Sequence, residues 1–269
     1  MKKILIAALA VLVVAGGLTA CRGKKSDGLT LKEGVLSIGM EIGYPPMEYH
    51  DANGNPVGFD VSMGKAIAEK LGLKAEFIDV GWDGIFSSVD TDRFDAIMSS
   101  VTITPERVNA HNFSKPYIAN TLAMVLRKDS AITAQSPEEC VGMDITFQSD
   151  TTADFYMQRL AAAGLNFTPR GYEKVMYCFN EMALGRVDVI VTDSLVAFEY
   201  TSPVDSPFVI VWLGSENPEV FGICMKKGND ALTDAVNKAL EDLFDDGTML
   251  EISNQIFGMD LVTEARNQW

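Results

Sequence analysis

The segment "DAIMSSVTITPER" (residues 95–107) begins as an apolar β-strand and then changes character. After the apolar run 96–98, hydroxyl side chains follow at Ser99, Ser100 and Thr102. In an open parallel α/β sheet, ligands bind outside the carboxyl ends of the strands. This run of hydroxyl groups therefore predicts a binding site at the end of a buried strand.

The last four residues of this segment, "TPER", predict the start of a helix. Thr104 is a suitable N-cap, and Pro105 is favoured at the first helical position. Arg107 then falls in the first turn, where the helix dipole disfavours a cation and a bound anion would remove the conflict. A carboxylate could meet the guanidinium group, a backbone N–H and a hydroxyl there. The alternative is that Arg107 pairs with Glu106 or with a neighbouring aspartate.

On both sides of this segment, strand-like and helix-like patterns alternate along the chain. Two successive βαβαβ runs predict an α/β fold with two mainly parallel sheets, each flanked by helices. The expected strands are 34–40, 74–80, 93–98, 141–147, 166–170 and 187–193, and the expected helices are 59–73, 82–91, 151–164 and 172–185.

Two further extended segments, 121–130 and 217–230, predict two crossings between these halves. We expect lobe 1 to consist of residues 30–120 plus 221–269. We expect an inserted lobe 2 over residues 121–220, with hinge segments at both of its ends. A cleft between two hinged lobes is the expected ligand site.

The first twenty residues, "MKKILIAALAVLVVAGGLTA" (1–20), have the pattern of a secretory signal peptide. The apolar stretch at 4–18 is shorter than the roughly 20 residues of a membrane-spanning helix. The ending "LTAC" (18–21) resembles the lipobox of bacterial lipoproteins, which implies cleavage before Cys21 and acyl chains attached through its thiol. Residues 21–29 would then be a lipidated tether. We therefore expect an extracytoplasmic protein anchored to the cell membrane by lipid.

Composition and charge exclude several classes of protein. The net charge of −15 argues against binding to nucleic acid, which requires a basic face. The chain has no phosphate-binding loop pattern, so we expect no nucleotide hydrolysis. It has only two histidines and no Cys/His spacing typical of metal sites, so we expect no metal and no cofactor. Cys140 and Cys178 either form a disulfide or are small buried residues.

Four segments of the chain resemble the polar amino-acid-binding proteins of bacterial ABC transporters. The likeness extends, with the motifs in order, from about residue 30 to residue 262. It implies the type II periplasmic-binding-protein fold, in which two lobes are joined by two hinge strands. The segments are "YPPMEYHDANGNPVGFDVSMGKAIAEKLG" (44–72), "WDGIFSSVDTDRFDAIMSSVTITPERVNAHNFSKPY" (82–117), "GRVDVIVTDS" (185–194) and "DGTMLEISNQIFG" (246–258).

The resemblance implies roles for individual residues at the two ends of an amino acid. The family holds the ligand α-carboxylate with the arginine of the "TPER" motif, here Arg107, assisted by Thr102 and Thr151. The α-amino group is held by the backbone at Ser100 and by the carboxylate of Asp193. The alternative for Asp193 is that it, or the residue after it, caps the following helix.

The ligand side chain would lie between two aromatic rings, Tyr44 and Trp82, and would contact Ser99. Phe147 and Thr152, on either side of the second lobe's binding loop, are further candidates for ligand contact.

The second lobe's binding loop departs from the family pattern. Family members commonly have "QGTT" or "QGST" here, and this chain has "QSDTT" (148–152). Ser149 replaces a glycine that lets the backbone approach the carboxylate. Asp150 places a negative charge near the cleft and is therefore a further candidate site residue.

These features predict the capture of a free amino acid by cleft closure and its delivery to the permease of an ABC transporter and the permease's ATPase. Glu41 lies where basic-amino-acid binders of the family carry an acidic residue, which favours a polar or basic ligand side chain. Cystine-binding members also carry glutamate there, so cystine is an alternative. We expect a monomer without enzymatic activity. Other functions on this fold are a cyclohexadienyl-dehydratase-like enzyme and a sensory binding protein.

Overall fold

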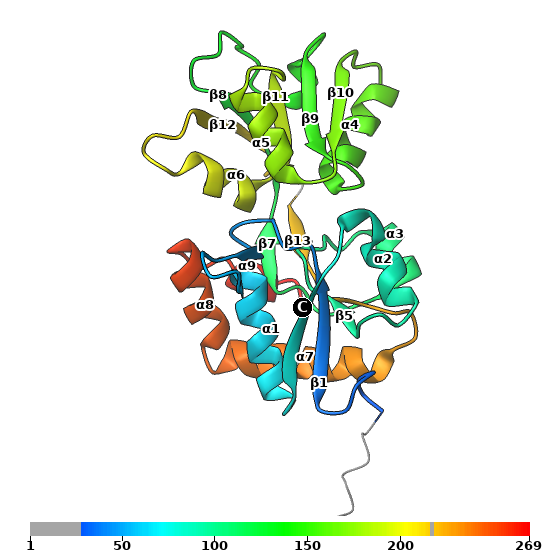
Figure 1. Ribbon diagram of the computed structural model, residues 1–269. Helices are drawn as coiled ribbons and strands as arrows, with labels where there is room; N and C mark the ends of the chain where they lie inside the picture. Colours follow the sequence, from blue (N-terminus) through cyan, green and yellow to red (C-terminus); the bar gives the residue numbers. More distant parts are fainter. Residues whose placement is uncertain (1–27, 216–217) are drawn as a thin grey trace, which may run out of the picture.

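The computed structural model describes residues 28–215 and 218–269 of the chain. The predicted signal peptide, the lipidation site Cys21 and tether residues 21–27 lie outside the described residues. The described chain forms two lobes, one above the other in Figure 1, and each lobe contains a five-stranded sheet with helices packed against it. This confirms the predicted two-lobed α/β fold.

The first lobe combines segments from the beginning and the end of the chain. Its strands are β1 (Val35–Met40), β4 (Lys74–Asp79), β5 (Ala96–Ile97), β6 (Asn112–Phe113) and β14 (Cys224–Met225), with a small hairpin of β2 (Tyr49–His50) and β3 (Pro56–Val57). Its helices are α1 (Phe59–Lys70), α2 (Trp82–Asp90), α3 (Pro105–Ala110), α7 (Asp230–Asp245), α8 (Thr248–Phe257) and α9 (Thr263–Arg266). The strand order is β4-β1-β5-β14-β6.

The second lobe is formed by the middle of the chain. Its strands are β8 (Leu122–Arg127), β9 (Asp144–Gln148), β10 (Thr168–Tyr172), β11 (Val189–Asp193) and β12 (Phe208–Leu213). Its helices are α4 (Thr152–Ala162), α5 (Val175–Ala183) and α6 (Ser194–Thr201), with a 3₁₀ turn η1 (Pro137–Glu139). The strand order is β10-β9-β11-β8-β12. Among the described helices of both lobes, none has the length and apolar character needed to cross a membrane.

Only part of each sheet is parallel. In the first sheet β1 runs parallel to β4 and β5, and β14 is antiparallel to β5 and β6. In the second sheet β9 runs parallel to β10 and β11, and β8 is antiparallel to β11 and β12. The sequence did not predict β12 as a strand, and it placed β8 at a crossing. The apolar pattern of a segment indicates a strand, but it does not give the strand's direction or its neighbour in the sheet.

The chain passes between the lobes twice, through two short strands that lie side by side (Figure 1). These are β7 (Ile118–Asn120) and β13 (Glu219–Phe221), which pair antiparallel to each other. Paired connections of this kind allow two lobes to rotate as rigid bodies while a few residues absorb the change in backbone angles.

The cysteines of the described chain are buried and free. Cys140 packs in a hydrophobic cluster with Met124 and Ile145, whereas Cys178 packs in another cluster with Val175 and Phe179. Because the two thiols lie in different clusters, they do not form the disulfide. The sequence left open whether Cys140 and Cys178 form a disulfide or are small buried residues, and the structure shows that they are small buried residues.

Candidate ligand-binding site

Arg107 lies in the first turn of α3, where the "TPER" pattern predicted it. Thr104 caps the helix, and its Oγ1 accepts a hydrogen bond from the backbone N–H of Arg107 at 3.2 Å. The guanidinium group turns back toward the strand end, where Nη1 donates to the carbonyl oxygen of Thr102 at 3.0 Å. Residues just before the helix thus hold both the backbone N–H and the guanidinium group of Arg107.

The guanidinium group of Arg107 is held by aromatic rings rather than by a carboxylate. It lies 5.4 Å from the ring centre of Trp82 and 5.2 Å from that of Phe86. Among the described residues Arg107 forms no ion pair, so the alternative pairing with Glu106 is not formed. Burial lowers the pKa of Arg107 from its usual value, which reflects the cost of keeping a cation away from water.

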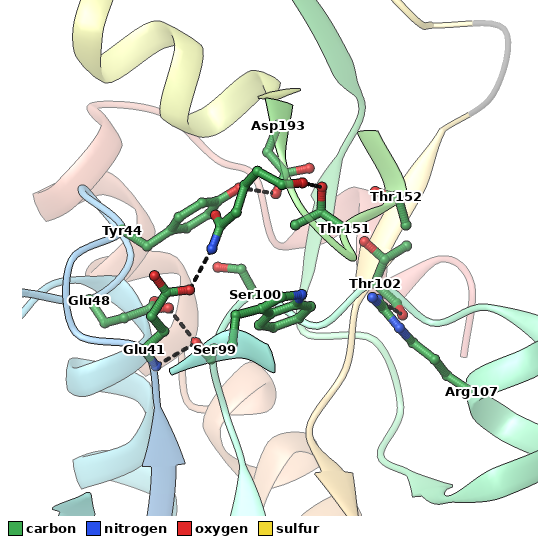
Figure 2. A pocket seen from close by; sticks show the side chains of 12 residues that line it. Glu41, Tyr44, Glu48, Ser99, Ser100, Thr102, Arg107, Thr151, Thr152 and Asp193 are labelled. Atoms are coloured by element: carbon green, nitrogen blue, oxygen red, sulfur yellow. Dashed lines mark hydrogen bonds between the residues drawn. The ribbon is translucent and has the colours of Figure 1, made fainter. Parts of the chain in front are cut away.

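Arg107 faces a narrow cavity between the two lobes (Figure 2). Most of the predicted site residues line this cavity, together with Glu48 and Gln148, which the sequence analysis missed. The predicted residues that line it are Glu41, Tyr44, Trp82, Ser99, Ser100, Thr102, Arg107, Thr151, Thr152 and Asp193.

Asp193 faces the cavity from the second lobe, at the end of β11. Its Oδ2 accepts a hydrogen bond from the Tyr44 hydroxyl at 2.5 Å, and its Oδ1 accepts one from Asn120 Nδ2 at 2.7 Å. Its side chain makes no capping hydrogen bond to α6, so the alternative role as a helix cap is not taken. Burial raises the pKa of Asp193 to about 6, while these two hydrogen bonds and the charge of Arg107 oppose the shift.

Glu41 lies at the opposite end of the cavity, directly after β1 (Figure 2). Only 3% of the residue is exposed. Its Oε2 accepts a hydrogen bond from Gln148 Nε2 of the second lobe at 2.6 Å. Burial raises the pKa of Glu41 to about 7, and the Gln148 hydrogen bond and the charge of Lys174 hold it below a still higher value.

A second pair of acids, Glu48 and Asp60, is buried beneath the serines at the strand end. The Ser99 hydroxyl donates to Glu48 Oε1 at 2.6 Å, and the backbone N–H of Ser100 donates to Asp60 Oδ2 at 2.8 Å. Burial raises the pKa of Asp60 to about 6, and burial together with the negative charge of Asp60 raises the pKa of Glu48 well above its usual value. Glu48 Oε2 and Asp60 Oδ1 are buried without a hydrogen-bond partner among the described residues.

This pair also restricts what Ser100 can do. Because Asp60 already accepts from the Ser100 N–H, the carbonyl oxygen is the backbone group left to accept from a ligand ammonium group. A sequence signal for the pair exists, since Glu48 and Asp60 stand in the otherwise apolar stretches "PPMEY" and "GFDV".

A third acid missed by the sequence analysis, Glu219, lies beside the Arg107 end of the cavity. Its Oε2 is within hydrogen-bond distance of the Thr102 and Thr152 hydroxyls, at 3.4 and 3.2 Å, and of Asn120 Nδ2 at 3.3 Å. Burial and the negative charge of Asp193 raise the pKa of Glu219 to about 7. The residue stands on the hinge strand β13, where the sequence indicated a crossing and no site.

The binding loop of the second lobe differs from the expectation at two positions, Phe147 and Asp150. Phe147 packs in a hydrophobic cluster of the second lobe and does not line the cavity, because neighbouring side chains of a strand point to opposite faces and Gln148 takes the cavity side. Asp150 has a left-handed φ of 61° and lies outside the cavity, in a hollow against Phe86. The Thr151 hydroxyl caps α4 and donates to the Gln148 carbonyl oxygen at 2.7 Å.

The two lobes are in direct contact around the cavity. Besides the Tyr44–Asp193 and Gln148–Glu41 hydrogen bonds, the indole Nε1 of Trp82 donates to the carbonyl oxygen of Asp150 at 3.1 Å. The site is therefore assembled only when the lobes are together.

Chemically, the cavity offers a cation and an anion at one end and a carboxyl group at the other. Arg107 has donors left for an anion, and Asp193 is an acceptor for a cation. Within residues 28–215 and 218–269, no cluster of His, Cys, Asp or Glu side chains has the arrangement of a metal site.

Comparisons with known proteins agree with this architecture. The chain is 27% identical over 263 residues to the L-cystine-binding protein TcyJ of Escherichia coli (strain K12), covering 97% of each chain. Among solved structures, it is similar to the P235GK mutant of ArgBP from T. maritima, with a TM-score of 0.77, 32% identity and coverage of 84% and 96% of the two chains. It is also similar to the ancestral amino acid-binding protein AncCDT-1, a precursor of cyclohexadienyl dehydratase, with a TM-score of 0.77, 33% identity and coverage of 83% and 96%.

The match to a family model extends over residues 36–259, which include the second lobe, both hinge strands, every residue that lines the cavity and all of the first lobe except its ends. The chain therefore belongs to the bacterial extracellular solute-binding proteins, family 3.

Proposed function

We propose that this protein captures a free amino acid outside the cytoplasm and delivers it to the permease of an ABC transporter, whose ATPase supplies the energy. The observation that carries the proposal is the placement of Arg107 and Asp193 on different lobes of a single cavity, close enough for their charges to interact. The α-carboxylate of an amino acid would pair with Arg107, and its α-ammonium group would pair with Asp193 and the Ser100 carbonyl oxygen. A ligand that joins these two charges would hold the lobes together.

The Glu41 end of the cavity supports a ligand with a polar or basic side chain. An ammonium or guanidinium group could bind the Glu41 carboxylate and take the place of the Gln148 amide hydrogen bond. Such an ion pair would compensate the cost of burying this carboxylate.

Cystine is the alternative ligand. Lys174, at the N-cap position of α5, is close enough for its charge to lower the pKa of Glu41. A second amino-acid head group could place its ammonium at Glu41 and its carboxylate toward Lys174.

The first experiment is a thermal-shift panel on the protein after unfolding and refolding to remove carried-over ligand. The panel holds the common amino acids, cystine, ornithine, citrulline, prephenate and arogenate. A ligand at 100 times its Kd stabilises the folded protein by about 2.7 kcal/mol. A shift with one class of amino acid supports capture, and the order of the shifts decides what Glu41 recognises. The absence of any shift contradicts the proposal.

An enzyme of the cyclohexadienyl-dehydratase type is the second candidate. Glu41, with its pKa near 7, could exchange a proton at neutral pH, as an acid–base catalyst must. The same panel separates the two functions. A response to prephenate or arogenate alone, followed by measured turnover, would favour the enzyme.

We also propose that residues 30–120 plus 221–269 move against residues 121–220 as rigid bodies.

We further propose that the mature protein is a monomer anchored by acyl chains at Cys21. A Cys21→Ala variant should move from the membrane fraction to the soluble fraction and lose the lipid mass from its N-terminal peptide. A variant that stays in the membrane fraction contradicts the anchor.

A further inference from the structure

Glu219 connects the three parts of the molecule that meet beside Arg107. The hydroxyl of Thr102 comes from the first lobe, the hydroxyl of Thr152 from the second lobe, and the amide of Asn120 from the hinge strand β7. All three groups lie within hydrogen-bond distance of the same oxygen, Oε2, and Glu219 itself stands on the other hinge strand. No described cation lies within ion-pair distance of this carboxyl group.

The two hydroxyl groups are also donors that a carboxylate bound to Arg107 would need. A threonine hydroxyl has one proton to donate. While Glu219 is ionised, the Thr102 and Thr152 protons point toward its Oε2, and their lone pairs remain for any other neighbour. A ligand carboxylate arriving at Arg107 would then meet hydroxyl lone pairs and the negative charge of Glu219 together.

We propose that Glu219 is a positioning residue for the ligand carboxylate and that it takes up one proton from solvent when that carboxylate reaches Arg107. The inference rests on the proposed function, because it needs a ligand with a carboxylate. Protonation converts the Glu219 carboxylate to a carboxylic acid, whose new O–H donates to one threonine hydroxyl. That hydroxyl can then turn its own proton toward the ligand, and the repulsion between the two carboxylates is removed.

The charges around Glu219 make this proton uptake favourable near neutral pH. Asp193 at the end of β11 is a second anion that raises the pKa of Glu219, which already stands at about 7. The positive charge of Arg107 on α3 lowers the pKa of neighbouring carboxyl groups. A ligand carboxylate bound to Arg107 would partly neutralise this charge. The other charged side chains that line the outer hollow shared by Glu219 are Glu106 of α3 and Arg159 of α4, and α4 also carries Asp154.

The test counts protons during binding. Isothermal titration with L-arginine, L-glutamine and L-cystine as probes, in two buffers of different ionisation enthalpy from pH 6 to 9, gives the number of protons taken up. We expect the wild-type protein to take up a fraction of a proton that is largest between about pH 7 and 8.5. Its affinity should fall as pH rises in this range, by at most about tenfold per pH unit. The Glu219→Gln side chain resembles protonated glutamate, so this variant should take up none and should bind more tightly than wild type at pH 8.5.

Control variants distinguish the proposal from a structural role and from other titrating groups. Glu41→Gln should retain the proton uptake, and Glu219→Asp should retain it with an altered midpoint. The proposal is wrong if Glu219→Gln binds more weakly than wild type by the same factor at every pH. It is also wrong if this variant takes up protons as wild type does, because another group would then be the proton acceptor. If a probe binds wild type with an affinity independent of pH, only this inference fails. If no probe binds at all, amino-acid capture fails with it.

Discussion

The two ends of the cavity use charge in different ways. At one end Arg107 and Asp193 present opposite charges that match the two charges common to all free α-amino acids. At the other end Glu41 is a buried acid whose partner, Gln148, is an uncharged amide from the opposite lobe. The first end can recognise the class of ligand, and the second end can select among its members, because only the side chain of the ligand reaches it.

The strongest test of this comparison is Arg107→Ala. Truncating one partner of a buried charge pair typically costs 2 to 5 kcal/mol or more, so we expect binding of any amino acid to weaken by about 30-fold at least. Arg93→Ala removes an exposed arginine of the same lobe outside the cavity and should leave binding unchanged. Titration calorimetry measures the affinity, and circular dichroism confirms the fold. An Arg107→Ala protein that binds as wild type contradicts the assignment of the carboxylate end.

Asp193→Asn should have the next largest effect. The amide keeps the size of the side chain and removes the charge that would pair with the ligand ammonium, so we expect a loss of about tenfold to 100-fold. Because the pKa of Asp193 is about 6, wild-type binding should weaken as pH falls below 6, whereas the variant should not change there. Tyr44→Phe removes one hydrogen bond to Asp193, keeps the charge and should cost less. Equal losses in the two variants would mean that the charge of Asp193 is not what matters.

Glu41→Gln tests the Glu41 end of the cavity independently of the Arg107 end. For a ligand with a cationic side chain such as L-arginine we expect about tenfold weaker binding, and for neutral L-glutamine we expect little change. The measured quantity is the ratio of the affinities for L-arginine and L-glutamine. An effect of the substitution on closure of the lobes would change both affinities and cancel in this ratio. A uniform loss for both ligands would assign Glu41 to the closure of the lobes rather than to selection.

The same variant should change how stability depends on pH. An acid whose pKa is raised by folding binds more protons in the folded state than in the unfolded state, so stability falls as pH rises between the two pKa values. For Glu41 this window extends from about 4.5 to about 7, and each pKa unit corresponds to about 1.4 kcal/mol. Ligand-free wild type should therefore lose thermal stability from pH 5 to pH 7 more steeply than Glu41→Gln. Parallel melting curves for the two proteins would contradict the raised pKa.

The smallest effect is expected for Glu48→Gln. Burial and the charge of Asp60 favour the protonated form of Glu48, and a glutamine can accept from Ser99 as Glu48 does, so stability should change by less than about 1 kcal/mol. Glu48→Leu leaves the Ser99 hydroxyl without its acceptor and should cost more. The urea unfolding midpoints of the two variants test this. Similar losses in both would show that Glu48 is ionised in the folded protein.

The Arg107 end was predictable from sequence because local rules place its residues. A strand end followed by Thr104 and Pro105 fixes where a helix begins, and the helix start fixes Arg107. Glu48, Gln148 and Glu219 were missed because their positions depend on contacts between segments far apart in the chain. Glu219, for example, is 117 residues from Thr102, and the hinge brings the two side chains together.

Sequence patterns also failed to predict those parts of the fold that depend on contacts between distant segments. Nearly every expected strand and helix is present, because apolar periodicity reports on one segment at a time. The antiparallel strands β8 and β12 depend on which neighbours a segment finds in the sheet. Phe147 was placed at the site and Gln148 was not, because the two differ only by the face of β9 to which each side chain points.

The indole hydrogen bond across the lobes gives the protein its own optical reporter. The chain has three tryptophans, and Trp82 is the one that lines the cavity. Its ring is stacked near a guanidinium cation, and its N–H is bonded to a carbonyl oxygen of the opposite lobe. Separation of the lobes would give this N–H to water and change the polarity around the ring. The emission spectrum of the unlabelled protein should therefore report opening and closing in real time, without any attached dye.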